Sequence, residues 1–265
     1  MKRNNSELKR LARETLTGHY GTPMSGMVLV SLIPNLLILP FNMTLNNSIS
    51  QTIIFYIASI FISVLSFLLS CGLCRMHLNM RRKQPFGLGD VFYFFSHHPD
   101  RLIRGYFSIL GITILVCIPM AIVLSIGIYL TNTPNLVLSG TESNLILIIT
   151  TVLAIVFLIP AVPVLYNYSL FAYLLVDDPD KKVKDALKES HSIIKGHRFH
   201  LFVLQLSFLG WFLLGISSCF IGFLWIEPYY EQTLVSFFFE LTGETDRLEA
   251  QKDIKNDTAH FEAYC

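Results

Sequence analysis

Three side chains that could bind a soft metal follow one another at helical spacing. Cys71, Cys74 and His77 are separated by steps of three, which places them on one broad face of a helix. A tetrahedral site needs ligands from a second element, and no second cysteine pair occurs in the polar segments. Small Cys and Gly side chains also let membrane helices approach closely. We therefore expect no cofactor and no metal, and keep these three residues only as weak metal candidates.

Two carboxylates occur inside an apolar segment near the end of the chain. Glu227 and Glu231 flank a Pro-Tyr-Tyr sequence. An ionisable group at membrane depth is costly, and is for that reason a candidate functional group. Together with Asn167 and Gln205 from two other apolar segments, the carboxylates could line a polar cavity that binds a solute or relays protons. The alternative is structural, with Glu231 near the inner headgroups and Glu227 protonated or bonded to a tyrosine hydroxyl.

No catalytic signature accompanies these groups. The chain has no phosphate-cradling glycine loop, no His-Glu-x-x-His helix, no serine elbow with partners and no nucleic-acid-binding module. We therefore expect a protein that is not an enzyme and does not bind nucleic acid.

The elements that must position these residues are long and apolar. The 265 residues are 52% hydrophobic and 15% charged, with a mean hydropathy of +0.53. Apolar blocks of this length predict an all-α, polytopic membrane helix bundle with about six transmembrane helices. The predicted spans are about 24–41, 52–74, 102–130, 145–174, 200–217 and 220–239. Pro160 and Pro163 should kink the fourth span.

Polar segments flank and separate the spans. We expect a cytoplasmic amphipathic helix in residues 1–23, a membrane domain over 24–240, and a polar cytoplasmic tail over 241–265 that is mostly disordered or forms a frayed helix. Two further cytoplasmic helices are predicted at about 90–97 and 179–195. Each third of the chain then has an amphipathic helix, an outgoing span and a returning span. This pattern indicates a threefold repeat, or a chance likeness of the joints.

The capping residues fix the expected bounds of the cytoplasmic helices. Asp90 suits the N-cap of the first, and Asp178 with Pro179 suits the start of the second. Gly196 suits the residue just past the second helix. Near the N-terminus, residues 6–17 put four apolar side chains on one side, and a short basic helix of this kind tends to lie in the headgroup layer. Those side chains are Leu8, Leu11, Ala12 and Leu16.

The positive charge is confined to four clusters. All twenty Lys and Arg residues lie within 2–13, 75–104, 181–198 and 247–255, and the polar gaps 42–51 and 131–144 have none. Because Lys and Arg near a span resist translocation, both termini should be cytoplasmic. The five cysteines, an odd number in or near apolar segments or at the chain end, argue against a disulfide framework.

Basic residues beside the second span are candidates for contact with lipid headgroups. They are Arg75, Arg81, Arg82 and Lys83. Such cations attract anionic lipid, although topology alone would also require them. As partners we expect membrane lipids, anionic headgroups among them, and either another membrane protein or further copies of this chain.

The stretch from about 159 to 240 resembles a known family. It has a proline-containing span that ends in Tyr and Ser, an Asp-Pro helix start, a Lys-Gly-His turn, a Ser-Phe-x-Gly-Trp span and a Trp-x-x-Pro-Tyr element. Here these are Pro160 and Tyr166, Asp178 and Pro179, Lys195 to His197, Ser207 to Trp211, and Trp225 to Tyr229. The chain is similar to the bacterial multi-pass membrane proteins of Domain of Unknown Function 975. The resemblance implies a bacterial cytoplasmic membrane protein with about six spans, and it assigns no activity to any residue.

Two functional hypotheses follow from the sequence. The first is a non-enzymatic interaction or membrane-homeostasis component of the cytoplasmic membrane. The alternative is a transporter or channel subunit with a polar site around Glu227 and the proline-broken fourth span.

Overall fold

The protein is built from helices that gather at one end. The structure is a computed structural model that describes residues 3–43, 48–132 and 140–262, and within these ranges it has helices and no strand. The all-α class predicted from the sequence is therefore confirmed. Parts of both cation-free gaps and the last three residues of the predicted tail lie outside the described ranges.

The helices follow one another in this order. They are α1 (Asn5–Leu16), α2 (Gly21–Met43), α3 (Ile49–Arg81), the 3-10 helix η1 (Leu88–Phe92), α4 (Tyr93–Ser96), α5 (Pro99–Asn132), α6 (Gly140–Tyr166), α7 (Phe171–Asp177), α8 (Val183–Ile194), α9 (Arg198–Leu206), α10 (Leu209–Ser217), α11 (Phe223–Thr242) and α12 (Glu244–Glu262). A short helix followed by two packed apolar segments occurs three times: α1 before α2 and α3, α4 before α5 and α6, and α8 before the α9–α10 segment and α11. In the third, it is α10 that packs against α11.

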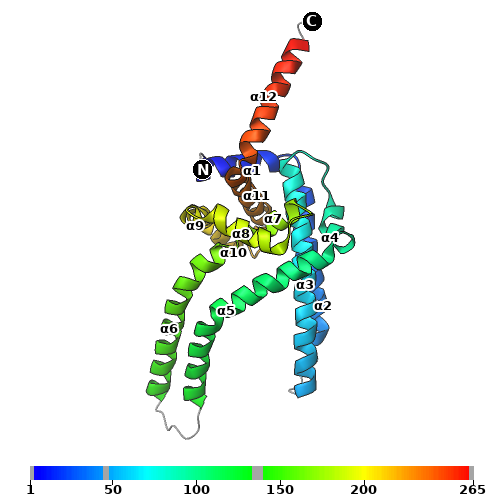
Figure 1. The fold of residues 1–265 in the computed structure, drawn as a ribbon. Helices are drawn as coiled ribbons and strands as arrows, with labels where there is room; N and C mark the ends of the chain where they lie inside the picture. Colours follow the sequence, from blue (N-terminus) through cyan, green and yellow to red (C-terminus); the bar gives the residue numbers. More distant parts are fainter. Residues whose placement is uncertain (1–2, 44–47, 133–139, 263–265) are drawn as a thin grey trace.

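Two long hairpins extend from a compact head. In Figure 1, α2–α3 and α5–α6 run toward the bottom of the view, whereas α1, α7, α8 and α11 gather near the upper end of α3. We call these four helices, with the adjoining end of α3, the head. Helix α11 is its centre, and the Phe237, Phe238 and Phe239 side chains are at most 1% exposed. The head therefore has a true hydrophobic core, made of protein rather than lipid contacts.

Five helical segments of the described chain are long and apolar enough to cross a membrane. They are Gly21–Asn42, Ile49–Arg81, Pro99–Asn132, Thr141–Asp177 and Arg198–Ser217. The predicted sixth span, 220–239, is not among them. It forms most of α11, whose second half is buried in the head and carries buried polar side chains. Its apolar residues are those of a protein core, which sequence hydropathy alone does not separate from a span.

The α1 helix packs on protein rather than lying freely among headgroups. Leu8, Ala12 and Leu16 are fully buried, and α1 packs against α11. The Asn4 side chain caps the helix by accepting a hydrogen bond from the Glu7 backbone N–H at 3.0 Å. The predicted apolar face is therefore present, and α11 covers it.

Two predicted helix starts differ in the structure. The Asp178 carboxylate accepts a bond from the Asp180 backbone N–H at 3.0 Å, so residues 178–182 form turns and α8 begins at Val183. Asp90 lies inside η1 rather than at its N-cap, and its carboxylate accepts from the Gly87 N–H at 3.0 Å. Gly196 follows the end of α8 with φ +88°, a conformation that suits glycine.

The fourth and fifth predicted spans are each divided into two helices, where the sequence predicts no break. Helix α6 continues through Pro160 and Pro163 and ends at Tyr166, and the chain turns before α7. The fifth is divided into α9 and α10 at Ser207 and Phe208, so each part has only nine residues. Neither nine-residue helix alone reaches across roughly 30 Å of hydrocarbon.

The predicted disordered tail is helical from Glu244 to Glu262. Gly243 ends α11 with φ +74°, and α12 starts at once with acidic side chains in its first turn. In Figure 1, α12 projects from the head, away from the hairpins. Its sequence lacks an apolar stripe, which explains both the disorder prediction and the projection away from the core.

Candidate functional site

A buried polar tie joins α3 to α11. The Nδ1 atom of His77 lies 2.7 Å from Oε1 of Gln232, and Nε2 of Gln232 donates to the His77 carbonyl at 3.5 Å. Both side chains are at most 1% exposed. The amide oxygen can only accept, so Nδ1 carries the proton and donates it. This pair fixes α3 against α11 and leaves Nε2 of His77 buried without a hydrogen-bond partner among the described residues.

The metal candidates do not form a metal site. No group of three or more His, Cys, Asp or Glu side chains is placed to hold a metal ion within the described ranges. His77 is bonded to Gln232, Cys71 is buried in the head core, and Cys74 is a free thiol at its edge. The close packing expected of small residues is seen next to Cys71, because Gly72 lies directly against the Val91 backbone.

A second polar chain links three helices through Gln205. The Tyr166 hydroxyl, at the end of α6, donates to Oε1 of Gln205 on α9. Nε2 of Gln205 in turn donates to the Tyr230 hydroxyl on α11 at 2.9 Å. The predicted binding residue Gln205 therefore satisfies its amide within the protein, and the two tyrosines that complete the chain were not predicted as site residues.

The other predicted binding residues have different surroundings. Glu231 accepts a hydrogen bond from the Tyr173 hydroxyl at 3.1 Å. Glu227, one turn earlier on α11, is exposed. Asn167 lies in the turn after α6, where its backbone carbonyl accepts from the Ser190 hydroxyl at 2.8 Å, and its side-chain oxygen is buried without a described partner. The four candidates thus lie on α11, α9 and one turn, and none of them lines either pocket described below.

Two of the predicted headgroup cations contact protein groups. Arg75 stacks on the Tyr93 ring at 3.5 Å from its centroid and reaches Asp90 with Nε at 3.3 Å. Arg82 forms a bidentate pair with Glu244, at 2.5 and 2.8 Å, and a third contact with Asp177 at 2.6 Å. The hydrogen bonds to Glu244 raise the pKa of Arg82 although burial opposes them. Arg82 therefore ties the end of α3 to the ends of α7 and α11–α12.

The other two cations line a polar pocket of about 1110 Å³. Its walls are α1, the residues that follow α3, and the first half of α12. Arg81 and Lys83 contribute from the α3 end, and His19 and Phe86 meet edge to face there, with ring centroids 5.6 Å apart. Because the tail is predicted to be mostly disordered, sequence patterns do not indicate this third wall.

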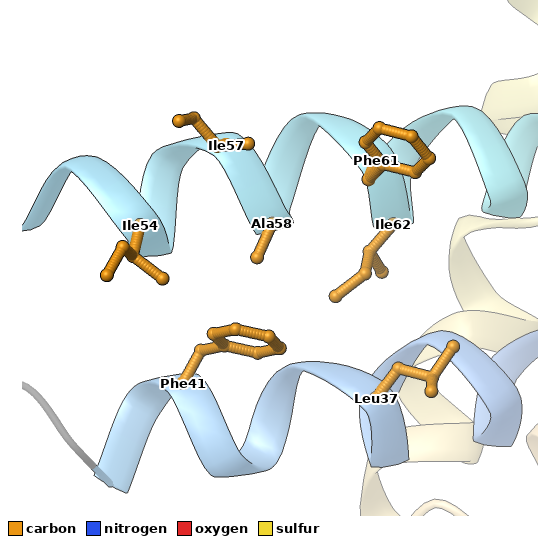
Figure 2. A pocket seen from close by; sticks show the side chains of 7 residues that line it. All are labelled: Leu37, Phe41, Ile54, Ile57, Ala58, Phe61 and Ile62. Carbon is orange, nitrogen blue, oxygen red and sulfur yellow. The ribbon is translucent and has the colours of Figure 1, made fainter. Parts of the chain in front are cut away.

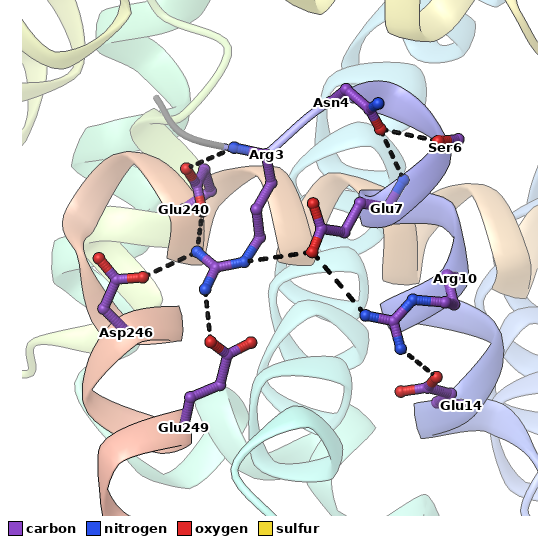
Figure 3. A network of polar contacts seen from close by, with 9 residues as sticks. All are labelled: Arg3, Asn4, Ser6, Glu7, Arg10, Glu14, Glu240, Asp246 and Glu249. Carbon is purple, nitrogen blue, oxygen red and sulfur yellow. Dashed lines mark hydrogen bonds and ion pairs between the residues drawn. The ribbon is translucent and has the colours of Figure 1, made fainter.

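One wall of the pocket is held by a network around Arg3 (Figure 3). The guanidinium bonds Glu240 at 2.6 Å, Asp246 at 2.8 Å and Glu249 at 2.5 Å. Burial lowers the pKa of Arg3, but these hydrogen bonds more than offset it, so the pKa is raised. The network fixes the start of α1 against α12. Asp246 and Glu249, three residues apart on one helix face, were the only sequence signal for it.

A second, apolar pocket of about 390 Å³ lies between the two arms of the first hairpin (Figure 2). Phe41 and Leu37 from α2 face Ile54, Ala58 and Ile62 from α3. The lining offers almost no polar group, so it can take only an apolar chain or side chain.

These features define a class of protein. The described chain has five apolar helical segments, and its hydrophobic core and polar pocket lie at the same end of two long hairpins. These are the features of a polytopic α-helical membrane protein. The chain belongs to the family described as protein of unknown function DUF975, whose model matches residues 1–245. The resemblance stated from the sequence is thereby confirmed. No curated protein and no solved structure matches the chain.

Proposed function

We propose that this protein is a non-enzymatic component of the bacterial cytoplasmic membrane that acts by binding at its cytoplasmic side. The observation that carries this proposal is where the charged groups lie. Residues 105–141 and 143–176, which supply most of α5 and α6, contain no Asp, Glu, Lys, Arg or His, and neither do 21–43 and 49–74. Charged side chains gather instead at the head and on α12.

The same charge distribution supports the orientation. The four Lys and Arg clusters lie on α1, at the end of α3 and start of α5, on α8 and its flanks, and on α12. In Figure 1 these elements are at the head end, away from the far ends of both long hairpins. Under the positive-inside rule the head and both termini are cytoplasmic.

The hydrogen bonding gives less support to a transporter. Gln205 and Glu231 are bonded to tyrosine hydroxyls within the protein. Glu227 lies outside both pockets, and the apolar pocket has no ion ligand. A polar path would need such groups to face a shared water-filled space.

Reconstitution of the full chain into liposomes tests the proposal. We expect proton and potassium fluxes equal to those of empty liposomes, and the same fluxes from the Glu227→Gln variant. A flux that the unmodified protein supports and Glu227→Gln abolishes would show that the protein is a transporter and reject the proposal.

Site-specific photocrosslinking in cells provides the positive arm. A crosslinking amino acid at Lys252, on the rim of the polar pocket, should give a discrete adduct. The matched position Thr141, exposed at the far end of α6, should give none. Adducts from Thr141 but not from Lys252 would place the binding face at the far end of α6 and contradict the proposal.

A further inference from the structure

The polar pocket contains a guanidinium, that of Arg81, whose N–H donors are mostly without a described hydrogen-bond partner. Arg81 makes one long hydrogen bond, from Nη1 to the Thr15 hydroxyl at 3.3 Å, and its Nε is buried with no partner among the described residues. A guanidinium has five N–H donors, and burial without partners is costly. Arg81 therefore has donors available for a group that enters the pocket.

The other arginines of the pocket are already paired. Arg10 bonds Glu14 at 2.5 Å, and Arg82 bonds Glu244 and Asp177 as described. Lys83 and Lys252 also line the pocket, and the described residues place no carboxylate in contact with either. Arg81, Lys83 and Lys252 are thus cations that the described protein does not neutralise by contact.

The acidic groups of the pocket are fewer and mostly engaged. Glu14 is paired with Arg10, and Glu249 with Arg3 at 2.5 Å. Asp253 is the remaining carboxylate of the described lining. The described lining holds more cations than carboxylates, and an anion is favoured beside the three cations that no carboxylate contacts. The cations are Arg10, Arg81, Arg82, Lys83 and Lys252, and the carboxylates are Glu14, Glu249 and Asp253.

We propose that this pocket binds a phosphate group, with Arg81 as its principal ligand and Lys83 at its rim. Arginine presents a planar fork that matches phosphate oxygens, and lysine adds a mobile point charge. The Thr15 and Thr17 hydroxyls line the same pocket, but each already donates its proton to a backbone carbonyl, of Leu11 at 2.9 Å and of Arg13 at 2.7 Å, so the cations carry the binding. This inference deepens the proposed function and rests on it, because it supplies the chemistry of what is bound at the cytoplasmic side.

The position of the pocket gives two sources for that phosphate. Arg81 ends the segment Ile49–Arg81, and Gly21 begins the neighbouring span, so the pocket opens where two candidate spans end. A phospholipid headgroup meets the protein at that level, and a soluble phosphate compound reaches it from the cytoplasm. Both offer the same tetrahedral anion to Arg81.

Two binding measurements on the full chain distinguish these sources. The first is calorimetric titration of inorganic phosphate into the protein in phosphatidylcholine nanodiscs. The second is native mass spectrometry of protein released from nanodiscs of equal phosphatidylcholine and phosphatidylglycerol, which reports retained lipid. Binding in the first measurement indicates a soluble ligand, and selective retention of phosphatidylglycerol indicates a headgroup. Either result supports the site if the variants behave as follows.

Arg81→Gln should weaken the observed binding about tenfold or more, since it removes a charge-assisted hydrogen bond. Lys83→Gln, at an exposed position, should weaken the binding several-fold. The matched control is Arg104→Gln, whose side chain is 71% exposed, pairs with Asp100 and does not line the pocket. It should bind like the unmodified protein. If Arg81→Gln does not fold, Lys83→Gln decides the result.

Three outcomes would overturn the inference. They are an unmodified protein that binds neither probe, pocket variants that bind as well as the unmodified protein, and an Arg104→Gln variant weakened as much as the pocket variants. Each would reject the phosphate site while leaving the liposome fluxes and the Lys252 adduct, which test the proposed function, to be judged separately.

Discussion

His77 and Gln232 are hydrogen-bonded at 2.7 Å although 155 residues separate them in the sequence, and both are almost completely buried. The bond joins a helix that enters the membrane to the central helix of the head. Buried polar pairs of this kind specify one packing arrangement, because any other would leave the amide or the imidazole without a partner. The pair therefore sets the register of α3 against α11.

A double-mutant cycle tests this role. His77→Leu and Gln232→Leu should each lower the free energy of unfolding by about 2 kcal/mol, because each leaves a buried polar group unpaired. The double variant should lose clearly less free energy of unfolding than the two single variants lose together, because it contains neither unpaired group. Unfolding in detergent micelles measures all four proteins. Strictly additive losses would show that the bond does not couple the helices.

At Gly72 the backbone of α3 packs directly against the backbone of η1. A Cβ atom there would lie 2.6 Å from the Asp90 carbonyl oxygen and closer still to that of Val91. Gly72→Ala should therefore lower the melting temperature markedly, with a loss of about 2 kcal/mol or more. Gly111→Ala is the control, because a Cβ at that α5 position meets nothing within 4 Å. Equal melting temperatures for the two variants would contradict the packing described here.

Arg82 should hold α12 on the head. Its side chain is 21% exposed and faces Glu244 and Asp177, so Arg82→Gln leaves two partly buried carboxylates without their cation. We expect a loss of about 2 kcal/mol and faster limited proteolysis after residue 243. Arg104→Gln breaks an exposed pair and should change stability by less than about 0.5 kcal/mol. A proteolysis rate unchanged by Arg82→Gln would show that other contacts hold the helix.

The contribution of Arg3 to the free energy of unfolding should not vary with pH near neutrality. Its pKa is raised in the folded protein, so the stabilisation is complete below the ordinary arginine pKa and is lost only as the pH rises through the still higher folded value. Arg3→Gln should therefore destabilise the protein equally from about pH 6 to about pH 9. Chemical denaturation at several pH values measures the difference. A difference that changes sharply across this range would assign the effect to another group.

Local sequence patterns predict the apolar face of α1 and the end of α8, but not the starts of η1 and α8. Leu8 and Leu16 were placed on the buried face of α1, and Gly196 just past a helix end, because periodicity and glycine conformation act over a few residues. What periodicity does not tell is whether lipid or protein covers an apolar face. That is why α11 was predicted to be a span and why α1 was expected among headgroups.

Long-range polar contacts could not be predicted in the same way. Arg3 meets Glu240 across 237 residues, and nothing in either local sequence indicates the other. Glu227 is a candidate because it lies in an apolar segment, yet its side chain is exposed in the structure, and Glu231 is bonded to Tyr173. The polar pocket was missed because α12, which forms one wall, has no apolar stripe to indicate a packed helix.

Cysteine labelling in intact cells tests the central claim that the charged head faces the cytoplasm. In a background without native cysteines, Lys182→Cys marks the head and Thr141→Cys marks the far end of α6, and both positions are exposed. A membrane-impermeant maleimide should label Thr141→Cys in intact cells and Lys182→Cys only after the membrane is permeabilised. Labelling of Lys182→Cys from outside would contradict the orientation and the cytoplasmic binding site built on it.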